Sequence, residues 1–149
     1  MAGLGLDIKF DTRQVNRAIK RVVKDVKRPQ KFLNSVATEQ MDESKRRIRM
    51  TKSDPDNRKW APWSYATLKA RRADGTASRG LLYRTGMLLN SFAKKVERKR
   101  AIITNKTNYG KWLQFGTARM RARAFLGWGK QSIKSTSTMG VKFFGRGWK

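Results

Sequence analysis

The strongest constraint on the fold is the helical periodicity of apolar residues between positions 12 and 48. Valine and isoleucine recur at helical spacing at Val15, Ile19, Val22 and Val26. They predict a first helix from about Thr12 to Lys27, with Asp11 as its N-cap. Pro29 fits the first turn of a second helix. The apolar side of that second helix runs through Phe32, Leu33, Val36, Ala37, Gln40, Met41, Ser44 and Ile48. At about 1.5 Å per residue it would span roughly 33 Å, as long as a domain of this size.

Short segments on either side of these helices have sequence patterns that are typical of β-strands. Apolar and polar residues alternate at 6–10, which predicts a strand before the first helix. The same alternation at 92–96, followed by the β-prone run 101–104, predicts a hairpin that turns through 97–100. Residues 67–72 and 87–91 favour short helices. The predicted fold class is α+β: two N-terminal helices, one of them long, packed on a small antiparallel sheet in a single domain.

The segment from Tyr109 to Gly127 changes period part-way along. Its first aromatic and leucine residues lie close to helical spacing, which predicts one apolar face against a core; they are Tyr109, Trp112, Leu113 and Phe115. Gly116 is then placed to end the helix. After it, Arg119, Arg121 and Arg123 alternate with apolar residues, as on a strand with one basic face. The pattern indicates a surface for holding a partner.

Charge supports this interpretation. The chain carries 36 Lys and Arg against 10 Asp and Glu, a formal net charge of +26. A net charge of this size bears on association and on the choice of partners rather than on the fold. The last acid is Glu97, and the residues after it hold thirteen Lys and Arg and eight of the fifteen aromatic side chains. Basic residues among aromatics are typical of single-stranded nucleic-acid grooves, although buried aromatics beside solvated arginines would give the same composition.

The chain offers few of the residue types that enzymes use for catalysis. The chain has no His and no Cys, so the usual proton shuttles and thiol nucleophiles are missing. Asp54 and Asp56 flank Pro55, a context that favours a turn over a cation site. We therefore expect no enzymatic activity, no catalytic residue, no metal site and no cofactor. The N-terminal residues do not read as a signal peptide, and no stretch reaches the ~18 apolar residues that span a bilayer, so we expect no membrane partner.

Three signatures follow one another along the chain. The first is Trp60, Pro62, Trp63 and Ser64 with Thr67 and Leu68; the second is Leu82, Thr85, Gly86, Leu88 and Ser91; the third is Tyr109, Gln114, Phe115, Gly116 and Thr117, ending in Phe125, Leu126 and Gly127. In this order the chain resembles the virion morphogenesis, or tail-completion, proteins of tailed bacteriophages. The resemblance spans roughly residues 30–128, with Ala124 where the family usually has proline. We accordingly divide the chain into a virion-morphogenesis-like domain, 1–128, and a basic aromatic C-terminal extension of the same domain, 129–149.

The resemblance implies a structural neck protein that assembles as a homo-oligomeric ring and joins head to tail. Its partners would be other neck, connector and tail-terminator proteins, with contact to genomic DNA as a further expectation. It would reside at the neck of the virion, and in the host cytoplasm during assembly. The predicted partner-facing or DNA-facing residues are Arg119, Arg121, Arg123, Lys106 and Lys111. The alternative is a basic architectural protein that binds nucleic acid. A cationic protein acting on membranes is disfavoured, since no sustained basic amphipathic helix with an aromatic face is present.

Two interpretations of the tryptophans remain open at this stage. Trp60 and Trp63 could stack on bases, because indole rings bind nucleobases well. They could instead fasten a loop stiffened by Pro62 onto the helices, because tryptophan contributes heavily to small cores. The second interpretation is favoured.

Overall fold

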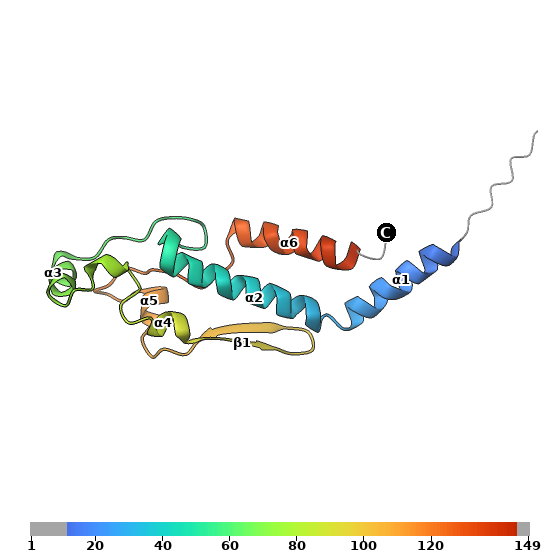
Figure 1. The fold of residues 1–149 in the computed structure, drawn as a ribbon, viewed down its shortest axis with the longest axis horizontal. Coiled ribbons are helices and arrows are strands. Elements are labelled where there is room, and N and C mark those ends of the chain that lie inside the picture. Colours follow the sequence, from blue (N-terminus) through green and yellow to red (C-terminus); the bar gives the residue numbers. More distant parts are fainter. Residues whose placement is uncertain (1–11, 146–149) are drawn as a thin grey trace, which may run out of the picture.

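The structure, a computed structural model, describes residues 12–145. The molecule is elongated, with the long helix α2 (Gln30–Arg46) along its middle (Figure 1). The β1–β2 hairpin lies along one side of α2 and helix α6 (Lys130–Phe144) along the other. Helix α1 (Thr12–Lys27) extends the molecule at one end, and α3 (Tyr65–Ala73) marks the opposite end. The predicted strand at 6–10 and the Asp11 cap lie outside the described residues.

The two predicted N-terminal helices are confirmed. Helix α1 has the predicted bounds. Helix α2 begins after Pro29 and continues through a π-helical turn, η1 (Arg47–Thr51), which ends at Lys52 in a left-handed conformation with φ 50°. One side of this continuous helix is buried, at the spacing of three to four residues that periodicity predicted. The buried residues are Val36, Ala37, Gln40, Ser44, Arg47 and Ile48.

The hairpin is also confirmed. Strands β1 (Phe92–Val96) and β2 (Ala101–Asn105) pair antiparallel, with Phe92 opposite Asn105 and Val96 opposite Ala101. Both strands pack on α2. The fold class is therefore α+β as predicted, although α1 packs chiefly against α6 rather than on the sheet. Within residues 12–145 the sheet contains only these two strands.

The core lies where the end of α2 meets the start of the hairpin. Helix α4 (Met87–Asn90) supplies two leucines to it, and the tryptophan loop, residues 60–64, supplies Trp60. The ring of Phe92 meets the ring of Phe125 edge-on, at 5.9 Å between centroids and 84° between planes. The buried cluster consists of Ile48, Trp60, Leu82, Leu88, Leu89 and Phe125. Core residues thus come from segments that are far apart in the sequence.

Residues 130–144, for which no helix or strand was predicted, form helix α6 along α2. The contact includes Phe32, whose ring lies 5.6 Å from that of Phe143 and 5.2 Å from that of Phe144. Gly129, just before α6, packs so closely on Pro55 that an added Cβ would lie 1.6 Å from the Pro55 carbonyl oxygen. Helix α6 therefore depends on two distant segments for its position.

Candidate partner-binding cleft

Residues 122–127, here called the hub segment, are held by side chains from several other elements. These side chains form hydrogen bonds with its backbone, as a neighbouring strand would. The Gln114 side chain donates through Nε2 to the Leu126 carbonyl (2.7 Å). Its Oε1 accepts the backbone N–H groups of Phe125 (3.1 Å) and Leu126 (3.0 Å). Trp60 Nε1 donates to the Ala124 carbonyl at 3.1 Å. Phe125 itself is 1% exposed. The backbone of this segment is thus satisfied by side chains of other elements.

A buried arginine fixes the same segment from the other side. Arg47 is 2% exposed, and its Nη1 donates to the carbonyls of Phe125 (3.3 Å) and Gly127 (3.1 Å). Its Nη2 donates to Ser132 Oγ at 3.1 Å, and Glu43 lies 3.8 Å away. Burial lowers the pKa of Arg47, with Glu43 opposing that shift. This one guanidinium joins the end of α2 to the hub segment and to the first turn of α6.

Neither Gln114 nor Arg47 was singled out from the sequence. Gln114 stands inside the third signature, and its amide carries separate donor and acceptor atoms, so it can pair with both an N–H and a C=O of a backbone segment. Arg47 lies at the start of η1, on the apolar side of the continuous helix between Ser44 and Ile48, which is the signal that could have identified it.

The tryptophan loop is fastened by its indoles, as favoured: Trp60 packs in the core against η1 and α4, and both indole N–H groups also donate to backbone carbonyls. Trp63 Nε1 donates to the Leu81 carbonyl at 3.2 Å. The guanidinium of Arg71, on α3, lies 4.5 Å from the centre of the Trp63 ring. Arg123 completes the attachment, since Nε donates to the Ala61 carbonyl (3.1 Å) and Nη2 to the Pro62 carbonyl (3.0 Å).

Arg123 was predicted to face a partner, but most of its guanidinium holds the tryptophan loop in place. Arg123 is 9% exposed, and burial lowers its pKa. Residues 119–123 form no strand: the chain turns back between Thr117 and Met120, which form an isolated bridge, and the Arg123 N–H donates to the Leu113 carbonyl at 2.7 Å. The strand alternation is lost at this turn, so Arg119 and Arg121 are exposed while Arg123 is buried.

These three arginines nevertheless share one cleft, here called the arginine cleft. It has a volume of about 670 Å³ and lies between the tryptophan loop, residues 81–82 and residues 119–123. Four arginines line it: Arg71, Arg119, Arg121 and Arg123. Its apolar part is formed by Leu81, Leu82, Leu113 and Met120 together with the loop. No Asp or Glu is among its lining residues.

Comparison with known protein families decides the identity of the chain. The model of the phage virion morphogenesis family matches residues 10–143. The chain belongs to that family. The match extends beyond the resemblance at residues 30–128, because it includes α1 and nearly all of α6. Comparisons with curated proteins and with solved structures gave no match. Membership gives the protein a structural role in phage morphogenesis and an association with the virion.

In this virion morphogenesis protein, helix α5 (Gly110–Phe115) does not bury the apolar face that the sequence predicted. Leu113 packs on the core, but Trp112 is 49% and Phe115 80% exposed, and Tyr109 is also exposed. The reason is length: in a helix of six residues, the side that reaches the core is occupied by Leu113. The result is an aromatic surface beside the arginine cleft.

The remaining predicted residues divide between turns and surface. Gly116 ends α5 at φ 76° and ψ −175°, and a Cβ there would lie 2.7 Å from the Met120 carbonyl oxygen. Gly86 is left-handed at the start of α4, where Thr85 Oγ1 accepts the Met87 N–H. Lys106 and Lys111 are exposed and do not line the cleft.

Two further observations concern other kinds of site. Within residues 12–145, His, Cys, Asp and Glu form no group of three or more that could hold a metal ion. Among the helices of that same range, none is both long enough and apolar enough to cross a membrane.

Proposed function

We propose that this protein is a neck, or tail-completion, protein that joins the phage head to the tail as a ring of identical subunits. The observation that carries the proposal is the family match, which covers every helix and strand from α1 to α5 and nearly all of α6. Its partners are other neck, connector and tail-terminator proteins. It acts by forming interfaces and not by catalysis, in keeping with a chain that has no His and no Cys.

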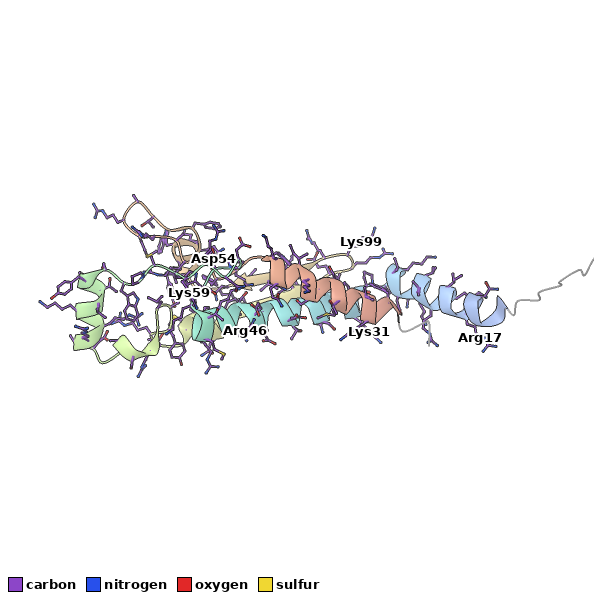
Figure 2. The ribbon with its side chains drawn as sticks, turned by 90° about the horizontal axis from the view of Figure 1, so that it is seen from above. Arg17, Lys31, Arg46, Asp54, Lys59 and Lys99 are labelled. Carbon is purple, nitrogen blue, oxygen red and sulfur yellow. The ribbon has the colours of Figure 1, made fainter. Side chains whose placement is uncertain are left out.

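Charge supplies a physical reason for assembly in a fixed order. A net charge of +26 on each subunit opposes the approach of a second copy. Basic side chains are spread over the length of the molecule, as Arg17, Arg46 and Lys99 illustrate (Figure 2). Subunits would therefore come together where an acidic partner surface or genomic DNA neutralises them. The exposed aromatics of α5 offer apolar contact area for the same encounter.

The test is deletion of the gene from the phage that encodes it. Lysates of the deletion strain, viewed by negative-stain electron microscopy, should contain separate heads and separate tails. Joined particles should return when the intact gene is supplied in trans. A deletion strain that produces joined, infectious particles in normal yield would rule out the proposal.

A second candidate is an architectural protein that binds nucleic acid. It is favoured by the thirteen basic residues and the absence of acids after Glu97. In that case the deletion strain would still join heads to tails. The purified protein would bind duplex DNA with a steep loss of affinity as salt rises.

A further inference from the structure

We propose that the arginine cleft binds an acidic, partly apolar peptide segment of a partner protein, with carboxylates on its arginines and apolar side chains on its leucine floor. This rests on the proposed function, because the partner is then a protein of the neck. It goes beyond it by naming the site on this chain and the chemistry of the segment that occupies it.

The positive charge of the arginine cleft is not balanced by nearby carboxylates. The ion pairs of residues 12–145 involve basic residues that do not line the cleft, namely Arg46, Arg47, Arg58, Arg84, Lys95 and Arg100. In that same part of the chain, none of the four cleft arginines has a carboxylate within 4.0 Å. Burial lowers the pKa of Arg71 first, and the positive charges of Arg84 and Arg123 lower it further, while Asp74 opposes this shift from beyond 4.0 Å. A carboxylate in the cleft would relieve like-charge repulsion.

The arginines of the cleft have N–H groups that no described residue uses. The hydrogen bonds of Arg123 use Nε and Nη2, so its Nη1 is not engaged by the described residues. Arg71 uses only Nη1, at 3.3–3.5 Å to three backbone carbonyls. Arg119 and Arg121 are exposed at the rim. A guanidinium with unused N–H groups binds a carboxylate through two parallel hydrogen bonds, which is among the stronger polar contacts in proteins.

The floor of the arginine cleft is apolar. Leu81, Leu82 and Leu113 line the arginine cleft and also an adjoining hollow of about 370 Å³, which reaches Met87 and Tyr109. The two hollows share these leucines and Arg71, so they lie side by side as a groove in two parts. Such a groove suits an extended segment in which apolar and acidic residues alternate, because successive side chains of an extended chain point to opposite sides.

The same features disfavour nucleic acid in this cleft. Single-stranded DNA is held by rows of aromatic rings on which successive bases stack. Within the described chain, Trp63 is the one aromatic residue that lines the arginine cleft, and Tyr109 is the one that lines the adjoining hollow, so the groove has no row of rings. The indole N–H of Trp63 is already bonded to Leu81, and Arg71 lies 4.5 Å from its ring centre. The groove between α2 and α6, about 450 Å³, is a weaker candidate for an acidic segment, because Glu39 there offsets Lys134 and Lys142.

The experiment compares two charge reversals in the full-length protein. The cleft variant carries Arg119→Glu and Arg121→Glu. The control carries Arg98→Glu and Lys99→Glu, which change the net charge equally. Both control residues are exposed at the hairpin turn, and Lys99 is labelled there in Figure 2. The probe is a fluorescein-labelled peptide in which glutamate alternates with leucine and serine, measured by fluorescence anisotropy at physiological salt. A peptide with glutamine in place of glutamate and an oligothymidylate serve as comparison probes.

We expect the cleft variant to weaken binding of the acidic peptide about tenfold or more, because it removes two charge-assisted contacts. The control should lose less than about threefold, because its charges act only from a distance through screened solvent. Equal losses in the two variants would overturn the proposal, since binding would then follow net charge alone. A loss confined to oligothymidylate would also overturn it, in favour of nucleic acid. Thermal unfolding checks that both variants are folded, and Arg119→Gln with Arg121→Gln should show a smaller loss in the same direction.

The two proposals can fail separately. The peptide assay requires no virion, so a cleft that binds the peptide while the deletion strain joins heads and tails refutes the assembly function alone. A deletion strain without joined particles, together with equal peptide binding by the two variants, refutes the cleft proposal alone.

Discussion

Replacing Arg123 with methionine tests whether this buried arginine supports the fold. Methionine keeps the unbranched apolar stem but removes the N–H donors that hold the carbonyls of Ala61 (3.1 Å) and Pro62 (3.0 Å). The tryptophan loop then loses one of its attachments to the hub segment. We expect Arg123→Met to lower the free energy of unfolding, and Arg119→Met and Arg121→Met to leave it nearly unchanged.

The magnitude follows from the environment of the two bonds. A hydrogen bond to a charged donor contributes about 1.5–3 kcal/mol, so the pair sets an upper limit of roughly 3–6 kcal/mol. Three effects reduce this. Pro62 is exposed, so water can replace the lost donor, and the cost of burying the guanidinium is recovered. Repulsion from Arg71 is also relieved. We therefore expect a loss of about 2 kcal/mol, or a fall in Tm of about 4–8 °C for a domain of this size.

Equilibrium unfolding in urea, followed by tryptophan fluorescence, measures these differences. The two exposed arginines are matched controls in the same segment, and their methionine variants should stay within about 0.5 kcal/mol of the parent protein. An Arg123→Met protein as stable as the parent would show that its hydrogen bonds only offset the cost of burial. A loss as large at Arg121 would show that the segment is held differently from the structure described.

Three other predictions follow from the same region and from its surface. Gln114→Leu should lose about 2–4 kcal/mol of unfolding free energy in urea melts, because two part-buried backbone N–H groups lose their acceptor and the Leu126 carbonyl loses its donor; a variant as stable as the parent would contradict this. Gly116→Ala should lower Tm more than Gly75→Ala, since both have positive φ but only the former would bring a Cβ within 2.7 Å of a carbonyl oxygen; equal shifts would contradict this. A hydrogen bond from Thr76 lowers the pKa of Asp74 in the folded state. The contribution of the Asp74 carboxylate to stability is therefore present above the ordinary Asp pKa and is lost as the pH falls through the folded value. The stability difference between the parent and Asp74→Asn should accordingly shrink in acid, and urea melts from neutral pH to about 2 would show a constant difference if the assignment is wrong.

The elements that the sequence determined are those whose signal is local. The bounds of α1, the course of the long helix through Ile48 and the position of the hairpin all follow from periodicities of 3.6 and 2. The role of Gly116 as the end of α5 is equally local, because only glycine adopts its backbone angles without strain. The three signatures, read in order, also gave the family.

What only the tertiary structure decided depends on partners that are distant in the chain. Alternating arginines predicted a strand, but a strand needs a neighbour, and here the N–H of Arg123 finds the Leu113 carbonyl at the end of a tight turn. The hub segment is paired by the Gln114 amide and the Arg47 guanidinium, which lies 78 residues from Phe125 in sequence. Residue type alone does not tell a buried arginine from an exposed one, because the difference lies in which backbone carbonyls the fold brings within reach. The same placement of distant segments brings the three arginines that were predicted to face a partner together with Arg71 in a single cleft.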